Sequence, residues 1–191
     1  FADAEVKVKE DIYLPRIHVA SIETCGCVAQ FDKIYGRLTV WMTTQAPHVI
    51  RTAFAIVTSI PENHIHIISP DIGGGFGGKV PIYPGYVIAS AAAILTGKPV
   101  KWIEDRIENL MSDSFARDYH MTVELAGKKD GTLTAMRLKT IADHGYTDAA
   151  ANPSKFPAGL LHFCTGSYDF KAAHVEVDAA YTNKPPGGIA Y

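Results

Sequence analysis

Arg37-Leu-Thr-Val-Trp-Met-Thr-Thr-Gln-Ala-Pro-His48 is the stretch in which the chain changes from one hydrophobic period to another. Its first part, Arg37–Thr44, is rich in β-branched and aromatic residues and predicts a strand. Beyond it, apolar residues at i, i+3, i+4 and i+7 predict a helix over Pro47–Ser59: Ile50, Ala53, Phe54 and Val57. Because Pro61 cannot continue this helix, the stretch defines a strand, a short polar turn and a helix of about three turns.

Strand and helix signals continue on both sides of this stretch. The predicted elements are, in order, an extended segment Glu5–Ser21, a strand His64–Ser69, a helix around Val87–Leu95 ended by Gly97 and Pro99, a strand Val100–Asp105, a hairpin of Tyr119–Ala126 and Leu133–Asp143, an irregular stretch Asn152–Tyr168, and a strand His174–Tyr181. This order predicts an α+β fold with mixed sheets and packed helices. We expect one domain over residues 1–191 with a sub-boundary near residues 112–118.

Composition and charge exclude several classes of protein. The 191 residues have a formal net charge of -2, 47% hydrophobic and 20% charged residues, the balance of a soluble globular protein. No basic excess indicates a nucleic acid partner, and no apolar run approaches the ~20 residues of a membrane span. The chain has neither an initiator Met nor a signal peptide, and both ends read as cut, so we interpret it as part of a longer protein.

Three cysteines are present, at positions 25, 27 and 164. An odd and sparse set does not form a disulfide framework and fits a reducing compartment. Cys25-Gly-Cys27 is too closely spaced for a zinc site and has no second pair. We therefore expect buried or half-buried thiols.

The run Asp71-Ile-Gly-Gly-Gly-Phe-Gly-Gly-Lys79 holds five glycines between Gly73 and Gly78. Glycine lets another molecule approach the backbone closely, and ordering it costs more entropy than ordering any other residue. A loop that contacts a ligand is therefore favoured over a plain turn.

Two phosphate-binding motifs compete for this loop. Gly73, Gly75 and Gly78 fit the dinucleotide pattern G-x-G-x-x-G, and the same run approximates a phosphate loop that ends in Lys79. The second pattern fails at Val80, where a hydroxyl is required, and Pro81 disturbs the helix start that both patterns need. A nucleotide-binding module that uses Gly73–Gly78 thus remains an alternative of a different class.

Several motifs in a fixed order resemble the molybdenum hydroxylases of the xanthine oxidase and aldehyde oxidase family. They are Glu23-Thr-Cys-Gly-Cys-Val-Ala29, Trp41-Met-Thr-Thr-Gln-Ala-Pro-His48, Pro70-Asp-Ile-Gly-Gly-Gly-Phe-Gly-Gly-Lys79, Gly97-Lys-Pro-Val-Lys-Trp102, Phe115-Ala-Arg-Asp-Tyr-His120, Ala142-Asp-His-Gly145 and Tyr181-Thr-Asn-Lys-Pro-Pro-Gly-Gly-Ile-Ala-Tyr191. They are more similar to the carbon monoxide dehydrogenase branch than to purine or aldehyde enzymes, and they cover nearly the whole chain.

The resemblance assigns roles to the strand end and the glycine loop. It implies part of a molybdopterin-binding domain in which Gln45 lies beside the molybdenum and donates a hydrogen bond to a metal-bound oxygen or to substrate. It places Gly74, Gly75, Phe76 and Gly77 near the molybdopterin, with Phe76 at the wall of the substrate channel or in ordinary core packing. Glu104, Asp105 and Arg106 also match the family, and we interpret them as structural ion pairs.

The resemblance further implies the cofactors and the reaction. Carbon monoxide is oxidised with water to CO2 at a molybdenum–copper centre, with molybdenum held by molybdopterin cytosine dinucleotide. The copper ligand is a Cys expected just after Tyr191, outside this chain, so we expect no metal ligand among the 191 residues, which alone are inactive. The alternative within the family is a molybdenum hydroxylase of an aldehyde or heterocycle that lacks copper.

The partners implied are an FAD-binding medium subunit and an iron–sulfur small subunit, assembled as a dimer of heterotrimers. Three cysteines cannot supply the four ligands of an iron–sulfur cluster, so the electrons require these partners. The resemblance implies a cytoplasmic location, including the inner face of the cytoplasmic membrane.

Overall fold

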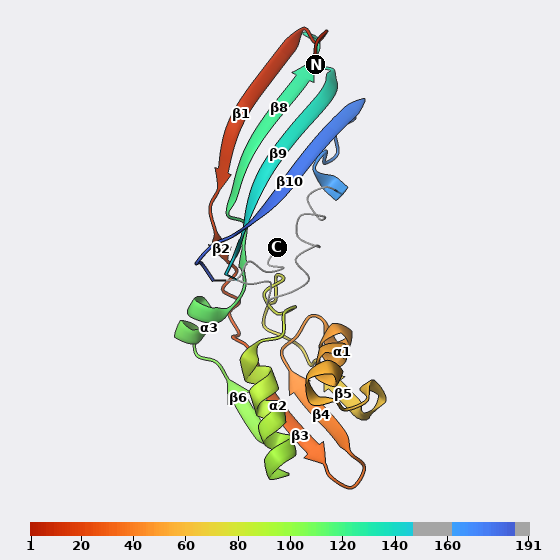
Figure 1. Cartoon of the computed structure of the whole chain (residues 1–191), viewed down its shortest axis with the longest axis vertical. Coiled ribbons are helices and arrows are strands. Elements are labelled where there is room, and N and C mark those ends of the chain that lie inside the picture. The colour runs from red at the N-terminus through yellow and green to blue at the C-terminus, as the bar shows by residue number, and fades with distance from the viewer. Residues whose placement is uncertain (147–161, 186–191) are drawn as a thin grey trace. The chain divides into compact units, whose positions relative to one another are not determined.

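The computed structural model describes residues 1–146 and 162–185 and divides them into two compact units (Figure 1). Unit 1 contains residues 1–17, 117–146 and 162–185, and unit 2 contains residues 18–116. The chain passes from one unit to the other at two short strands, β2 (Ile17–His18) and β7 (Phe115–Ala116). Most of the predicted irregular stretch 152–168, and residues 186–191, lie outside the described residues.

Unit 2 is built on a four-stranded sheet with the order β5-β4-β3-β6 (Figure 1). The strands are β3 (Gly26–Asp32), β4 (Arg37–Met42), β5 (Ile65–Ile68) and β6 (Val100–Ile103). β3 pairs antiparallel with β4 and with β6, whereas β4 and β5 are parallel. A parallel pair needs a crossover connection, and helix α1 (Pro47–Thr58), followed by the 3-10 turn η1 (Glu62–His64), provides it. The predicted strand–turn–helix is confirmed.

Helix α2 (Pro84–Thr96) confirms the second predicted helix. It ends where predicted, at Gly97, whose φ of +66° is left-handed and whose amide donates to the carbonyl of Ala93 at 2.9 Å. A Cβ at Gly85 would overlap the Trp102 ring, so this glycine lets α2 pack closely against β6.

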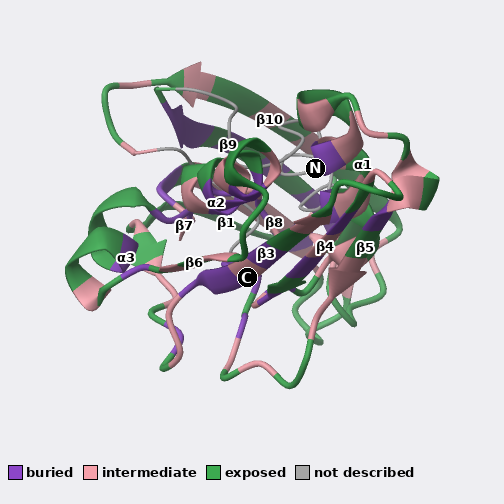
Figure 2. Ribbon diagram, turned by 90° about the horizontal axis from the view of Figure 1, so that it is seen from below, coloured by how far each residue is buried: buried purple, intermediate pink, exposed green. Residues whose placement is uncertain are grey.

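The core of unit 2 lies between the sheet and the two helices, and Figure 2 shows buried residues along β3 and β4. Its largest fully buried apolar side chains come from both layers: Leu38, Val40, Met42, Ile50, Phe54 and Tyr86. The strands therefore bury alternate residues, as β4 shows at Leu38, Val40 and Met42.

Strand β3 and helix α3 (Arg106–Ser112) of unit 2 were not predicted. Strand β3 lies within a segment that the sequence marked only as a motif, and it is central in the sheet, with Ala29 and Cys27 buried. Helix α3 is too short to show a hydrophobic period, but its start carries a capping box between Asp105 and Glu108 that sequence reasoning could have used.

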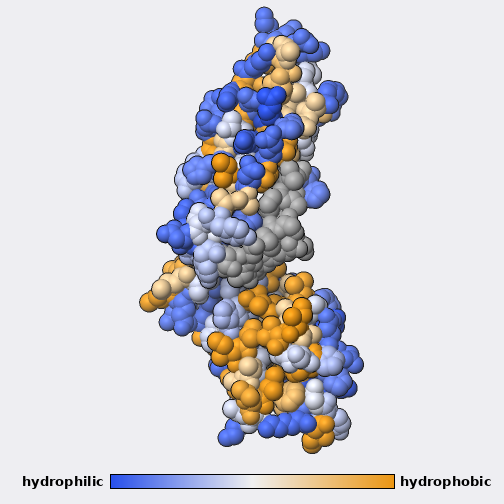
Figure 3. All heavy atoms as spheres, in the orientation of Figure 1, coloured by the Kyte–Doolittle hydropathy of each residue, from blue (hydrophilic) through white to orange (hydrophobic). Residues whose placement is uncertain are grey.

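The outer faces of α1 and α2 also carry apolar side chains, which Figure 3 shows over this part of unit 2. They include Val49, Ile56, Val57, Ile88 and Leu95. The helical period of apolar residues therefore predicted the two helices correctly. It did not show which face of each helix packs on the sheet, because apolar residues lie on the outer face as well. Within the described residues, no helix is long and apolar enough to cross a lipid bilayer.

Unit 1 is a four-stranded sheet with the order β1-β8-β9-β10 (Figure 1). Its strands are β1 (Val6–Leu14), β8 (Tyr119–Gly127), β9 (Leu133–Gly145) and β10 (Ala172–Tyr181). The predicted hairpin is confirmed as the antiparallel pair β8–β9, which turns at Gly131 with a φ of +91°. β10 is parallel to β9, a pairing that the sequence pattern did not specify.

Ion pairs among four charged side chains stabilise the end of this sheet. The carboxylates of Asp118 and Asp143 lie between Arg16 and Lys184, with Nζ of Lys184 at 2.7 Å from Asp118 and 3.2 Å from Asp143. Nε of Arg16 lies 3.1 Å from Asp118, and its guanidinium also donates to the carbonyl of Pro185. Because the Asp118 side chain is only 2% exposed, it needs these cations to remain charged.

Candidate functional site

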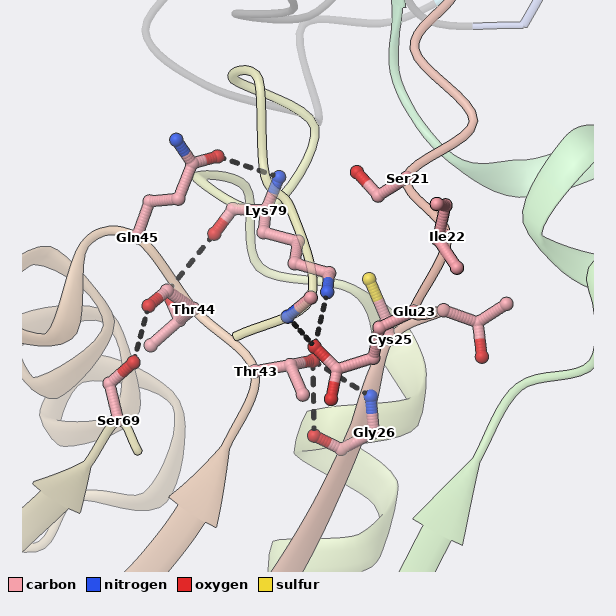
Figure 4. Close-up of polar contacts among 12 residues, drawn as sticks. Ser21, Ile22, Glu23, Cys25, Gly26, Thr43, Thr44, Gln45, Ser69 and Lys79 are labelled. Atoms are coloured by element: carbon pink, nitrogen blue, oxygen red, sulfur yellow. Dashed lines mark hydrogen bonds and ion pairs between the residues drawn. The ribbon is translucent and has the colours of Figure 1, made fainter. Parts of the chain in front are cut away.

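The predicted site lies where β4 ends, beside the loop that follows β5 in unit 2 (Figure 4). The backbone amide of Gln45 donates to the carbonyl of Lys79 at 3.0 Å, and the Thr44 hydroxyl donates to the same carbonyl at 3.1 Å. The Ser69 hydroxyl donates to the carbonyl of Thr44 at 2.6 Å. The ends of the two parallel strands are thus tied to each other and to the end of the glycine loop.

The side chain of Gln45 has one orientation that satisfies its neighbours. Its Oε1 accepts hydrogen bonds from the amides of Gly77, at 3.0 Å, and Lys79, at 3.2 Å. Since both partners are donors, the oxygen must face the loop and Nε2 must face away, as Figure 4 shows. In the described part of the chain, Nε2 has no acceptor, and Gln45 is exposed. Two hydrogens are therefore available to a ligand.

The glycine loop is shaped by three residues with positive φ: Gly74 at +94°, Phe76 at +50° and Gly77 at +84°. A Cβ at Gly75 would lie 2.6 Å from both Cγ and Oε1 of Gln45, so the loop packs directly on this side chain. The amides of Gly75 and Phe76, at the tip of the loop, have no acceptor among residues 1–146 and 162–185. Adjacent amides of this kind bind anionic or oxygen-rich groups.

Phe76 does not pack in the core. Its side chain is 61% exposed, and a Cβ on Gly74 would lie 2.9 Å from its ring. Of the two roles considered for Phe76, ordinary core packing is therefore wrong for this unit. A non-glycine residue at positive φ is unusual, and such strain is often found where a loop contacts a ligand.

Lys79 points inward. Its side chain is 2% exposed, and Nζ lies 2.8 Å from Oε2 of Glu23, which also accepts from the amide of Gly73 at 2.7 Å. The Lys79 ammonium, together with the Gly73 amide, holds the pKa of the Glu23 carboxyl below its usual range. A phosphate-loop lysine must instead reach a bound phosphate, so this loop does not have that geometry.

The dinucleotide interpretation fails on topology. In a dinucleotide-binding βαβ unit, the strand before the glycine loop and the strand after the helix are parallel neighbours in the sheet. Here β5 lies at one edge of the sheet and β6 at the other, and β4 and β3, which are antiparallel to each other, lie between them. The spacing of Gly73, Gly75 and Gly78 thus matched the motif without the fold that gives the motif its function.

Within residues 1–146 and 162–185, Glu104, Asp105 and Arg106 make hydrogen bonds and no ion pairs. Asp105 caps α3 through the amide of Glu108. Arg106 donates to the carbonyls of Ser21, at 2.5 Å, and Ile22, at 2.8 Å. The prediction of ion pairs was wrong because backbone carbonyls left over in the loop before β3 are the nearer acceptors.

A buried polar cluster lies beneath the site and was not predicted. Oε1 of Glu104 accepts from the amide of Cys25 at 2.6 Å and from Nδ2 of Asn109 at 2.8 Å. Oδ2 of Asp113 accepts from the same Asn109 nitrogen and from the Cys25 thiol, whereas its Oδ1 is buried without a hydrogen-bond partner. Ligand atoms of Cys25, Glu104 and Asp113 lie within 4.8 Å of one another.

The pKa of Asp113 explains how the carboxyl groups of Glu104 and Asp113 can both be buried in this cluster. Burial, reinforced by the neighbouring Glu104 carboxylate, raises the pKa of Asp113 to about 8. Burial, with Asp113 nearby, also raises the pKa of the Cys25 thiol. Near neutral pH, Asp113 is therefore mainly protonated, and the two neighbouring carboxyl groups do not both carry a charge. Both other cysteines are also free thiols, Cys27 buried and Cys164 half-buried, as predicted.

We expect Asp113→Asn to flatten the pH dependence of stability. A raised folded-state pKa contributes stability that is complete below the unfolded value, near 3.8, and is lost as pH rises through about 8. The amide keeps an acceptor for Asn109 and a donor for Glu104 but cannot ionise. The melting temperature of the wild type should thus fall between about pH 4 and 8 more steeply than that of the variant, since one linked proton changes stability by up to about 1.4 kcal/mol per pH unit. Parallel curves would show that Asp113 is already ionised or holds a metal ion.

Together, the fold and the site define a domain that presents two loop amides and one side-chain amide to a ligand rich in hydrogen-bond acceptors. The chain belongs to the molybdopterin cofactor-binding domain family, whose model matches residues 1–191. The glycine loop fits this kind of cofactor, because it leaves two tip amides unpaired and carries no side chain at Gly74 or Gly75 that would block close approach.

Similarity to individual proteins narrows the family to one branch. The chain is 57% identical to the carbon monoxide dehydrogenase large chain of Hydrogenophaga pseudoflava and 59% identical to that of Afipia carboxidovorans, each over 100% of this chain and 24% of the relative. It matches the structure of the reconstituted CO dehydrogenase from Oligotropha carboxidovorans with a TM-score of 0.90 and 59% identity, covering 100% of this chain and 24% of that one. The chain thus spans about a quarter of the length of these relatives.

Proposed function

We propose that this chain is part of the large subunit of an enzyme that oxidises carbon monoxide with water to CO2. The observation that carries the proposal is the identity of 57–59% over all 191 residues to two carbon monoxide dehydrogenase large chains. A relative named for another substrate, the nicotine 6-hydroxylase large subunit of Paenarthrobacter nicotinovorans, is 32% identical. The alternative of a molybdenum hydroxylase for an aldehyde or heterocycle is therefore less favoured.

In the proposed reaction, the residues of this chain bind the cofactor and orient the cofactor and the substrate. The unpaired hydrogens on Nε2 of Gln45 donate to an oxygen of the cofactor or of the substrate. The amides of Gly75 and Phe76 donate to the cofactor, and the exposed Phe76 ring excludes water from one side of it. When bound, molybdenum and copper supply the redox chemistry, in which CO and H2O become CO2, two protons and two electrons.

The finer features of the assembly follow from the same proposal. The cofactor is the cytosine dinucleotide form of molybdopterin, and the copper ligand is a Cys that follows Tyr191. The two electrons leave through an iron–sulfur small subunit and an FAD-binding medium subunit, in a dimer of heterotrimers located in the cytoplasm or at the inner face of its membrane.

CO-dependent reduction of a dye by the full-length protein with its partner subunits tests the proposal. We expect turnover that is lost when copper is removed with a chelator and restored by copper(I), while the molybdenum content stays constant. Turnover of aldehydes or heterocycles but not CO, by a protein that contains molybdenum and no copper, would establish the alternative. The residues that follow Tyr191 provide a second readout, because only the copper-dependent reaction requires a Cys there.

A further inference from the structure

Lys79 joins three segments of unit 2 that are distant in sequence. Its ammonium lies 2.8 Å from Glu23, in the segment that enters β3. Its amide donates to the Gln45 side chain at 3.2 Å, and its carbonyl accepts from the Gln45 amide at 3.0 Å. Figure 4 shows the contacts of the Lys79 amide with the Gln45 side chain and of the Lys79 ammonium with Glu23. The end of the glycine loop is thereby fixed to the segments beside β3 and β4 at the same time.

Glu23 also binds the first residue of the glycine loop, Gly73. Its Oε2 accepts from the Gly73 amide at 2.7 Å, and its own amide donates to the Gly73 carbonyl at 3.2 Å. A Cβ at Gly73 would lie 2.6 Å from Cβ of Glu23, so the two backbones are in close contact. One carboxylate oxygen therefore binds both the first glycine of the loop and the ammonium at its end.

Burial makes this ion pair sensitive to the loss of either partner. The side chain of Lys79 is 2% exposed, whereas that of Glu23 is 41% exposed. A buried ammonium without its anion is strongly unfavourable, but a half-exposed carboxylate without its cation is still solvated. Removing the charge of Lys79 is thus the milder change for the fold.

We infer that the Lys79–Glu23 ion pair positions Gln45 and the glycine loop for the reaction, an inference that rests on the proposed function. The pair does not contact the reacting atoms. It holds the loop closed between Gly73 and Lys79, and this closure places the two amides that donate to Oε1 of Gln45. Without it the Gln45 amide group can rotate, and its Nε2 is no longer directed toward the ligand.

The variants Lys79→Met, Lys79→Arg and Glu23→Gln, made in the full-length enzyme, test this inference. Met keeps the length of the side chain without its charge, Arg keeps the charge, and Gln at position 23 can still accept from the Gly73 amide. We expect Lys79→Met to lower kcat about 10- to 100-fold, the range that follows from a small displacement of a positioned group, and to change KM little. The molybdenum electron paramagnetic resonance spectrum should shift, and Lys79→Arg should recover part of the rate.

The matched control is Lys101→Met, since Lys101 is exposed on β6 and has no ion pair in the described part of the chain. Glu23→Gln should act in the same direction, and the double variant should be no slower than Lys79→Met alone, because both remove one interaction. If Lys79→Met does not fold, the double variant decides, because it leaves neither charge unpaired. A wild-type kcat and spectrum in folded, molybdenum-loaded variants would overturn the inference. The spectrum can be recorded after chemical reduction in the absence of CO, so this outcome is distinct from a wild type that fails to oxidise CO.

Discussion

We expect Gln45→Glu, made in the full-length enzyme, to lower kcat for the proposed oxidation of CO about 100- to 1000-fold, the loss typical when one preorganised donor is removed from an active site. The carboxylate keeps an oxygen for the amides of Gly77 and Lys79, so the loop remains anchored. Its second oxygen replaces Nε2 and can accept but not donate. The variant therefore separates the two functions of the side chain, anchoring of the loop and donation to a ligand.

Gln45→Ala provides the comparison, because it removes both functions. We expect it to lose molybdenum as well as activity, whereas Gln45→Glu retains the metal. Gln30→Glu, at an exposed position on β3, controls for the added charge. Steady-state kinetics and metal analysis of the full-length enzyme give both quantities. If Gln45→Glu turns over at the wild-type rate, Nε2 has no role in the reaction.

Gly75→Ala is expected to abolish cofactor binding. The added methyl group would lie 2.6 Å from Cγ of Gln45, closer than real Cβ atoms approach other atoms, so either the loop or the glutamine must move. The φ of Gly75 is not positive, and the effect is therefore steric rather than conformational. We expect the molybdenum content and kcat to fall at least about 100-fold, as for other displaced positioning groups.

A second change distinguishes this clash from general misfolding. Gly75→Ala combined with Gln45→Ala removes the side chain that the methyl group meets, so the double variant should have the protein yield and melting temperature of Gln45→Ala, without regaining molybdenum or turnover. Gly36→Asn, at a left-handed turn where the nearest atom would be 3.9 Å away, should behave as wild type. A Gly75→Ala enzyme with full molybdenum content would show that the loop can move without loss of the cofactor.

Local sequence patterns by themselves determined several elements of both units. The change of period after Thr44 located α1, the apolar spacing and Gly97 located α2 and its end, and the Asp-Gly signal located the β8–β9 hairpin. The resemblance also placed Gln45 and the glycine loop at one site, and the structure brings them into hydrogen-bond contact. Each of these features depends on residues a few positions apart or on a motif that is itself contiguous.

Only the tertiary structure decided which distant groups meet. Asp113 contacts a thiol 88 positions earlier, and Lys79 contacts a carboxylate 56 positions earlier. Neither pairing leaves a local signal, since Lys79 ends the run that only approximates a phosphate loop and Asp113 belongs to none of the motifs. Likewise the parallel register of β10 on β9 depends on which strand edges remain open after the hairpin has formed. The hydrophobic period of a sequence specifies a helix or strand and where it ends. The free energy of burying a charge depends instead on which partner lies within hydrogen-bond distance, and only the packing of the chain determines that partner.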